Sequence, residues 1–525
     1  MFLAEENGKA ILEQLLMKKN ILITLFFIFV LAFILRVLYL PKLALTFGYD
    51  QARDAFIVQE ILSGDIKILG PPASTPGLYH GVFYYYFLTP AYLIGQGDPI
   101  IAAYWTAFFN ALTVFVIFYL TYLLTKKSFP ALLAAFLFAV SFEATQYAVW
   151  LSNPTIGVWT VPLIYLGLWT WVKGEGKWGP ILTAIGLGLS IQAEIFLAYH
   201  IVPIILWLWV ARKQIVKGQF VKFASVLVLI LSSMILVEIK FGFRGISGLA
   251  NLLTTSDAVV KGRDIGDFII LYLNQIGRTF SNSLFPSNAG YGGVLGIGLI
   301  YLAIKRWTAA KKRQTLSWQP FLVTYTLAHL TVVSVGGIST PFLTVGIGSG
   351  IVILAAIVLT GIWKEKKNVA FILLLVIVLS NLSTILIENK KGQTIFSIQG
   401  DMLLSKQLPI IDYTYKEAEG KPFSINTLTS PLWVNTTWSY LYNWHGKNTY
   451  GYLPEWHGRD QVGRPGDNLP LTAEDTKLYF LILEPMQGIP VRYLSETVGQ
   501  EDFYSEIVEE KKLGEITVQK RIRKE

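Results

Sequence analysis

Long apolar runs constrain this chain more than any other feature of its sequence. A helix needs about 20 residues to cross the hydrocarbon core of a bilayer. Eleven runs approach that length, and they cover residues 21–40, 100–124, 129–149, 155–172, 178–193, 195–211, 221–239, 291–304, 319–337, 342–363 and 368–387. Only 15% of the residues are charged, whereas about a quarter are in an average soluble protein. The sequence therefore predicts an α-helical polytopic membrane protein with about 11 transmembrane helices.

Clusters of Lys and Arg between the runs predict the orientation in the membrane. They lie within residues 9–19, 126–127, 173–177, 212–222, 305–313 and 364–367. Cytoplasmic loops carry an excess of Lys and Arg, and all six clusters fall on one side if residues 82–96 do not cross. This twelfth run is short, aromatic and broken by Pro90. We therefore expect it to be re-entrant or to lie at the membrane interface.

This orientation divides the chain into three parts. We expect residues 1–19 to form a cytoplasmic amphipathic N-terminus, residues 20–387 the transmembrane domain, and residues 388–525 an extracytoplasmic domain. The outer face then receives two long loops, 41–99 and 240–290. The tail combines strand-like runs with a helix-like run after Ser495, so it is predicted to be a small α/β domain. The chain is accordingly expected to be a multi-pass protein of the plasma membrane.

Charge and cysteine content exclude several functions. The net charge of +9 comes largely from the clusters between the membrane runs and does not indicate nucleic-acid binding. The chain contains no Cys, which excludes disulfides, thiolate metal sites and a Cys nucleophile. The expected partners are instead the lipid bilayer and substrates that approach from the outer face.

Acidic residues gather toward the predicted outer face. Glu143, Glu194 and Glu238 lie in or at the outer ends of apolar runs, and Asp50 and Asp54 lie in the first outer loop. Ionisable groups at membrane depth are costly and often functional. For any single helix-end Glu, a solvated terminus is the better explanation. Together the acids predict a shared polar site, with Asp50, Asp54, Glu143 and Glu194 as candidate catalytic residues.

The strongest local motif is Gly48-Tyr-Asp-Gln-Ala-Arg-Asp, directly after the first apolar run. A helix starting near Asp50 would place Asp50, Arg53 and Asp54 on one face, at positions i, i+3 and i+4. The simpler alternative is that Asp50 only caps this helix. A carboxylate held by an Arg in a water-poor cleft can act as a general base toward a hydroxyl.

Other residues are candidates for substrate binding. A Pro- and Gly-rich stretch, residues 70–81, leads to His80 and Tyr84, although the aromatic residues there also fit an interfacial belt. Arg244, Arg263 and Arg278 lie in the second predicted outer loop. These Arg residues would bind either a substrate phosphate, together with Arg53, or lipid headgroups. Asn153 is a further candidate for substrate binding.

The order of these features resembles the GT-C membrane glycosyltransferases, and in particular glycosyltransferase family 39, which includes the dolichyl-phosphate-mannose protein mannosyltransferases and the aminoarabinose transferases. The similar features are an N-terminal apolar run, the acidic motif 49–54, the Pro-Pro stretch 71–86, a turn at Asn153-Pro154 and an outer C-terminal domain. The resemblance spans roughly residues 15–390, and its specific motifs lie mostly within 48–155.

The resemblance implies transfer of one sugar from a polyprenyl-phosphate donor to an acceptor hydroxyl on a protein, lipid or glycan, with inversion. Asp50 matches the essential loop carboxylate and Arg53 the basic residue after it. Gln51 and Asn153 stand where relatives have carboxylates. We therefore expect either no cofactor or a divalent cation, Mg²⁺ or Mn²⁺, held by Asp50 and Asp54, and we favour transfer without metal because Arg53 would repel a cation.

Two other classes of function fit parts of the sequence. A transporter or flippase for a lipid-linked or small polar substrate would also use membrane acids, but here the acids gather at one surface. A scaffold or sensor would bind glycan through the Trp-rich tail, although an ordinary small core explains those Trp residues as well.

Overall fold

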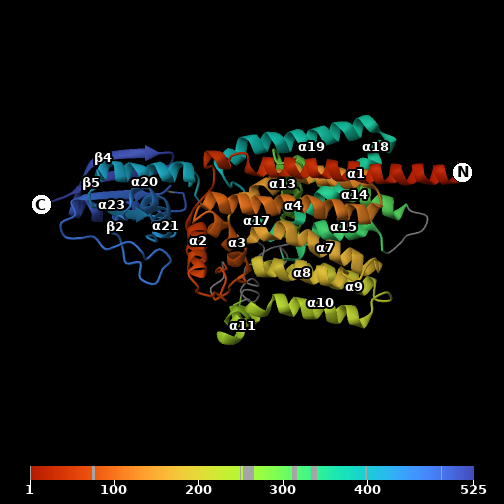
Figure 1. Cartoon of the computed structure of the whole chain (residues 1–525), viewed down its shortest axis with the longest axis horizontal. Helices are drawn as coiled ribbons and strands as arrows, with labels where there is room; N and C mark the ends of the chain where they lie inside the picture. Colours follow the sequence, from red (N-terminus) through yellow and green to blue (C-terminus); the bar gives the residue numbers. More distant parts are fainter. Residues whose placement is uncertain are drawn as a thin grey trace.

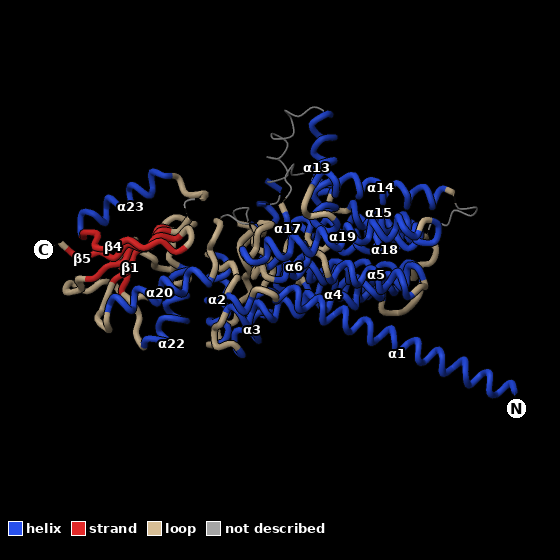
Figure 2. Tube along the Cα trace, turned by 90° about the horizontal axis from the view of Figure 1, so that it is seen from above, coloured by secondary structure: helices blue, strands red, loops and turns tan. Residues whose placement is uncertain are grey.

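A bundle of helices and a small α/β domain lie end to end along the longest axis of the molecule (Figure 1). The computed structural model describes residues 2–73, 77–248, 250–251, 265–309, 316–332, 340–396, 399–485 and 487–524, with side chains from residue 18 onward. The N-terminus lies at the end of the bundle that is remote from the α/β domain (Figures 1 and 2). The fold is therefore mainly helical, with one small sheet.

The bundle contains helices of very different lengths. They are α1 (Phe2–Val37), η1 (Leu40–Lys42), α2 (Tyr49–Leu62), α3 (Phe83–Ile94), α4 (Pro99–Thr125), α5 (Ser128–Ala139), α6 (Phe142–Ala148), η2 (Asn153–Ile156), α7 (Gly157–Lys173), α8 (Gly179–Ala193), η3 (Ile195–His200), α9 (Ile201–Val210), α10 (Lys217–Ile230), α11 (Ser232–Lys240), α13 (Ile265–Leu284), α14 (Ala289–Thr308), α15 (Trp318–Leu327), α17 (Pro341–Thr344), α18 (Ile347–Glu365), α19 (Lys367–Glu388) and η4 (Asn389–Lys391).

Helices in the described ranges are long and apolar enough for an integral membrane protein. Five of them can cross a membrane by length and composition, and eight spans result if each bent pair counts as one. The bent pairs are α5 with α6 (56°), α10 with α11 (58°) and α13 with α14 (95°). Each of the eleven apolar runs coincides at least in part with helix. The number of about 11 spans itself stays a prediction.

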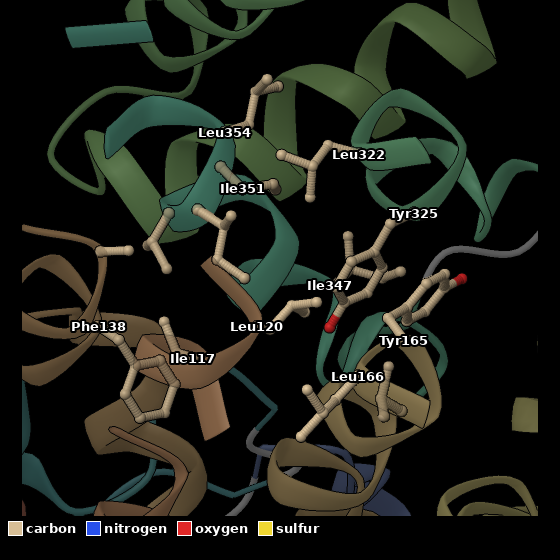
Figure 3. Close-up of a cluster of buried hydrophobic side chains, with 14 of the residues drawn as sticks. Ile117, Leu120, Phe138, Tyr165, Leu166, Leu322, Tyr325, Ile347, Ile351 and Leu354 are labelled. Carbon is tan, nitrogen blue, oxygen red and sulfur yellow. The ribbon is translucent and has the colours of Figure 1, made fainter. Parts of the chain in front are cut away.

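The core of the bundle is formed by side chains from helices that are far apart in the sequence (Figure 3). Tyr165 of α7 stacks on Tyr325 of α15 with ring centroids 3.5 Å apart, and the Tyr325 hydroxyl donates to the carbonyl of Gly346 at 2.8 Å. Ile117 of α4 and Ile351 of α18 are fully buried in the same cluster. This packing makes α4, α7, α15 and α18 the central helices.

Helix α13 differs from the expected outer loop 240–290. Residues 252–264 lie outside the described residues, but Ile265–Leu284 form a helix of 20 residues. Gln275, Thr279 and Ser283 on this helix are buried, whereas Ile269 and Leu273 are exposed. Helix α13 thus buries several polar side chains and exposes apolar ones, and it forms a bent pair with α14. The assignment of this part of the chain to an outer loop stays a prediction.

Helix α1 also corrects an expectation. Residues 1–19 were expected to form an amphipathic segment separate from the first span, but a single helix runs from Phe2 to Val37. No Pro interrupts this stretch, and Lys18 and Lys19 are good helix formers. In Figure 2 the N-terminal part of α1 extends beyond the other helices.

Helices α2 and α3 run crosswise at the end of the bundle that faces the α/β domain (Figure 1). They pack on each other, and α3 also packs on α4. Helix α3 is not among the candidate membrane spans of the described residues, and the expectation that residues 82–96 do not cross stays a prediction. The two helices therefore form a layer between the bundle and the α/β domain.

The C-terminal part contains a five-stranded mixed sheet. Its elements are α20 (Leu404–Ala418), β1 (Ser424–Leu428), α21 (Thr436–Leu441), η5 (Tyr442–Gly446), α22 (Lys447–Tyr450), β2 (Glu455–Trp456), β3 (Leu478–Leu483), α23 (Val491–Tyr504), β4 (Ser505–Leu513) and β5 (Ile516–Arg523). The strand order is β2-β1-β3-β5-β4. Strand β1 is parallel to β2 and β3, whereas β5 is antiparallel to both of its neighbours.

The α/β domain and the α2–α3 layer share one hydrophobic core. Phe56 of α2 packs edge-on against Tyr440 of α21 at 5.1 Å, and Phe47 lies 5.6 Å from the same ring. Main-chain hydrogen bonds add to this contact, because the amide of Phe47 donates to the carbonyl of Met402 at 2.9 Å. Helix α2 is therefore held by α3 on one side and by the α/β domain on the other.

Candidate active site

A cavity of about 380 Å³ lies where the α2–α3 layer meets the C-terminal part. It is lined by Thr46, Gly48, Tyr49, Asp50, Gln51, Arg53, Pro72, Ala73, Trp150, Gln393, Phe396, Gln399, Met402, Ser430 and Pro431. The part of this lining that we call the roof comprises Gln393, Phe396, Gln399, Met402, Ser430 and Pro431. Asp50 and Arg53 are the charged residues among this described lining, so their charges dominate the cavity.

The start of α2 holds Asp50 at the cavity. Gly48 is the N-cap residue, so Asp50 lies in the first turn and does not cap the helix. The side chain of Gln51 fixes this turn, because its Oε1 accepts from the amide of Gly48 at 3.0 Å and its Nε2 donates to the carbonyl of Leu151 at 2.9 Å. The neutral Gln at this position thus has a structural role.

Arg53 joins the two aspartates of the motif. Its Nη1 donates to Asp50 Oδ1 at 2.6 Å, and its Nε and Nη2 donate to Asp54 Oδ1 at 2.8 and 2.7 Å. The Asp50 side chain is 54% exposed, whereas that of Asp54 is 2% exposed. Asp50 therefore faces the cavity, while Asp54 holds the guanidinium from behind.

Burial and charge act in opposite directions within this cluster. Burial alone would lower the pKa of Arg53, but the carboxylates of Asp54 and Asp50 raise it above its usual value. Burial raises the pKa of the Asp54 carboxyl, although Arg53 opposes this shift. Arg53 thus remains a fixed cation at the wall of the cavity, and Asp54 is too enclosed to reach a substrate there.

Three tyrosines of α3 surround the buried side of this cluster. Tyr84 and Tyr92 are buried beside Asp54, and Tyr85 lies against Arg53. The Tyr84 and Tyr92 hydroxyls and Asp54 Oδ2 are buried without a hydrogen-bond partner among the described residues. Tyr84 was expected to bind substrate or to sit in an interfacial belt. Because it is fully buried, it does neither in this structure.

His80, Asn153 and Glu194 come together at the break between α8 and η3. The amide of Ile195 donates to His80 Nδ1 at 3.2 Å, so a neutral ring carries its proton on Nε2, which lies 3.8 Å from Glu194 Oε2. Asn153 Nδ2 donates to the carbonyl of Ala193. Burial, together with the charge of Arg53, lowers the pKa of His80 to about 3. None of the three lines the cavity at Asp50.

The remaining acids are dispersed. Glu143 on α6 accepts from Ser283 Oγ of α13 at 2.6 Å and is buried within the bundle. Glu238 lines a second cavity of about 90 Å³, together with His80. Glu143 and Glu238 therefore have different neighbours from Asp50 among the described residues, and the shared polar site of the outer-face carboxylates stays a prediction.

Of the other predicted cations, Arg244 and Arg278 do not line the cavity at Asp50. Arg244 is exposed near the end of α11, and Arg278 is exposed on α13. Arg278 lies close enough to Glu143 to interact with it electrostatically. Arg263 lies outside the described residues. Arg53 is thus the predicted phosphate-binding residue that the described structure places beside Asp50.

The donor set at the site suits an anion better than a metal ion. Both Asp50 and Asp54 accept hydrogen bonds from Arg53, which lies between them. The described residues include no group of three or more His, Asp or Glu side chains arranged to hold a metal. A phosphate can take the place of a carboxylate on a guanidinium.

The roof was not predicted from the sequence. Gln393, Phe396 and Gln399 follow α19, and Ser430 and Pro431 follow β1. The one available signal was that residues 423–428 read as a strand, since ligands often bind beyond the carboxyl ends of parallel strands. The tail was expected to form a domain of its own, and its role was left open.

Comparison with known proteins gives a structural likeness without a sequence match. No protein-family model and no curated protein matches the chain. Apo ArnT from Cupriavidus metallidurans is 10% identical, with coverage of 94% of this chain and 97% of ArnT and a TM-score of 0.58. ArnT bound to undecaprenyl phosphate is 11% identical, with coverage of 96% and 98% and a TM-score of 0.60. The chain has the GT-C fold.

The GT-C likeness includes the C-terminal domain as well as the bundle, because the match to ArnT covers nearly the whole of both chains. Archaeal oligosaccharyltransferase AglB from Archaeoglobus fulgidus is also similar, at 13% identity, coverage of 93% of this chain and 72% of AglB, and a TM-score of 0.47. At such low identity the GT-C likeness concerns the fold, and the roles of Asp50 and Arg53 rest on their own geometry.

Proposed function

We propose that this protein is a membrane glycosyltransferase that moves a single sugar from a polyprenyl-phosphate donor to an acceptor hydroxyl, with inversion at the sugar carbon. The observation that carries this proposal is the half-exposed Asp50 carboxylate beside the Arg53 cation, at the wall of a cavity in a GT-C fold. The ArnT structure with undecaprenyl phosphate supports a lipid phosphate as the donor group.

In the proposed reaction, Asp50 accepts the proton of the acceptor hydroxyl as its oxygen attacks the anomeric carbon. The bond between that carbon and the phosphate oxygen breaks, and its electron pair stays on the phosphate. Arg53 neutralises the departing polyprenyl phosphate. Asp54 keeps Nε and Nη2 of Arg53 engaged, so Nη1 is the donor that turns from Asp50 to the phosphate.

The cavity lining favours an uncharged acceptor group. Apart from Asp50 and Arg53, the described lining consists of amide, hydroxyl, aromatic and aliphatic side chains. Amides and hydroxyls hydrogen-bond sugar or peptide hydroxyls, and Tyr49 and Trp150 offer aromatic surface. This composition supports a hydroxyl on a glycan, lipid or protein as acceptor over a second phosphate.

The test is release of polyprenyl phosphate by the purified protein from a panel of polyprenyl-phosphate sugars, including mannose and aminoarabinose. We expect release with at least one donor and faster release when a hydroxyl acceptor is added. A transporter or flippase moves its substrate without breaking this bond. Movement of the intact lipid without any release would contradict the enzyme.

We also propose that transfer needs no metal, because Arg53 supplies the positive charge at the leaving group. The same assay is run with EDTA and after re-addition of Mg²⁺ or Mn²⁺. We expect turnover to persist in EDTA. Loss of turnover that either ion restores would make Asp50 and Asp54 metal ligands instead.

We further propose that the N-terminus is cytoplasmic and that the cavity opens on the outer face, because the Lys and Arg clusters would then all be cytoplasmic. A single Cys placed after Gln96 in this Cys-free chain reports its side directly. Labelling by an impermeant reagent from outside is expected, whereas protection there would reverse the orientation.

A further inference from the structure

Glu484 is a buried carboxylate that the proposed reaction does not use. It follows β3 directly, in the C-terminal domain, and is 2% exposed. None of the ion pairs among the described residues includes it. A buried charge without a counter-charge is costly and is retained where it fixes one particular arrangement.

Three N–H groups converge on this carboxylate. The amide of Ser430 donates to Oε2 at 2.9 Å, and Trp438 Nε1 donates to Oε1 at 3.1 Å. The side chain of Gln399 also hydrogen-bonds to Glu484 and donates to the carbonyl of Pro485 at 3.0 Å. Because a carboxylate only accepts hydrogen bonds, Glu fits these three donors better than Gln, whose amide would face one of them.

Two of the donors belong to the roof of the cavity. Ser430 and Gln399 both line it opposite the start of α2. The third donor, Trp438, lies on α21, the helix that packs on α2. Glu484 therefore ties two separate roof segments to the element that contacts the helix of Asp50 and Arg53.

We propose that Glu484 is a positioning residue for acceptor binding, which sets the roof at a fixed place over Asp50. This inference rests on the proposed function, since it assigns the roof to the acceptor side of the same site. Glu484 touches no substrate. It acts through Ser430 and Gln399, so its loss weakens acceptor binding and leaves donor binding at Arg53 unchanged.

The chain offers a matched control. Glu501 lies in the same domain, is 3% exposed and accepts from Asn426 Nδ2, which is not a residue of the roof. Glu484→Gln and Glu501→Gln therefore remove the same charge at the same depth, and only the first disturbs donors that line the cavity. Burial raises the pKa of Glu484 to about 7, so both variants are assayed at about pH 8, where the wild-type carboxylate is ionised.

The first measurement is steady-state transfer with acceptor and donor varied separately. For Glu484→Gln we expect the acceptor KM to rise about tenfold, the change that loss of one hydrogen bond to a charged group gives. The donor KM and the kcat are expected to stay within about twofold of wild type. A role only in folding would lower the active fraction and leave both KM values unchanged.

The second measurement, hydrogen exchange of the amides in residues 429–435, requires no activity. Exchange is expected to be faster in Glu484→Gln and unchanged in Glu501→Gln. If no donor is ever cleaved, the proposed function fails, while this measurement still decides whether Glu484 anchors the roof. Should Glu484→Gln fail to fold, Trp438→Phe removes one donor and keeps the ring, and the same direction of change is expected.

The proposal is overturned if Glu484→Gln shows the acceptor KM of the wild type and also the wild-type exchange rates of the amides in residues 429–435. Equal effects of Glu484→Gln and Glu501→Gln would also overturn it, because the effect would then come from loss of any buried charge in the domain. A rise in donor KM alone would place Glu484 on the donor side and contradict the assignment.

Discussion

Two clusters near α2 and α3 contain the same kinds of residue and differ in access. The first cluster consists of Asp50, Arg53 and Asp54, and its half-exposed Asp50 faces the cavity. Glu194 and His80 are enclosed at the break between α8 and η3. Both clusters combine carboxylates with a basic side chain, so residue type does not distinguish them. The difference teaches that access to the cavity, and not the density of charged groups, distinguishes the two clusters, and for this reason the proposed chemistry is assigned to Asp50.

The largest expected effect is at Asp50. Asp50→Asn keeps the size of the side chain and removes the base, so transfer should fall by about 10² to 10⁴. The initial rate of polyprenyl-phosphate release measures it, with thermal unfolding as the check on folding. Asp65→Asn is the control, because Asp65 is an exposed acid that follows the same helix. More than about a tenth of wild-type activity in Asp50→Asn would remove Asp50 from the base role.

Arg53→Lys should have the next largest effect. Lys keeps the charge but does not reproduce the planar set of donors that joins Asp50 and Asp54. We expect kcat/KM for the donor to fall about 10- to 100-fold, as for the loss of hydrogen bonds to charged groups. Competition by free polyprenyl phosphate should weaken in parallel. If free polyprenyl phosphate competed as strongly in Arg53→Lys as in the wild type, this would show that another cation binds the phosphate.

Glu194→Gln tests the enclosed cluster directly. Gln keeps the size of the side chain, and Glu194 neither lines the cavity at Asp50 nor contacts the roof in the described structure. We expect transfer to remain within about threefold of wild type. A loss comparable to that of Asp50→Asn would end the distinction between the two clusters and make Glu194 part of the chemistry.

The smallest expected effect concerns His80 and pH. Its pKa is lowered to about 3 in the folded protein, against about 6.5 in an unfolded chain. The folded state therefore binds this proton less tightly, and stability is lost as pH falls below about 6.5. His80→Asn keeps an acceptor for the amide of Ile195. As the pH is lowered from about 7.5 to 5, the unfolding temperature of His80→Asn should fall less than that of the wild type. Parallel curves would contradict a neutral, buried His80.

The site helix was predictable because its signal is local. The spacing of Asp50, Arg53 and Asp54 predicts one helical face, and the structure has that helix and those contacts. Helix α13 was missed because Gln275, Thr279 and Ser283 interrupt its apolar run while facing inward. A search for continuous apolar residues does not detect a helix whose buried side is polar.

The roof was not predictable for a different reason. It depends on contacts between segments that are far apart in sequence, such as Gln407 Nε2 with the carbonyl of Phe47, 360 positions away. Neither Ser430 nor Gln399 has a residue type that indicates a site. Glu484 was also overlooked, because a single acid after a strand is typical of an ordinary strand end. Only the structure shows the three donors that converge on it.

The core shared by α2 and the C-terminal domain has a consequence for biosynthesis. Ribosomes make the bundle first, so Phe47 and Phe56 leave the ribosome hundreds of residues before Tyr440, the ring that covers both of them. Domains generally fold in the order in which they are synthesised. Until the last quarter of the chain has been made, Asp50 and Arg53 stand on a helix with one side uncovered. The proposed activity is therefore expected to appear only when the final domain has docked on α2.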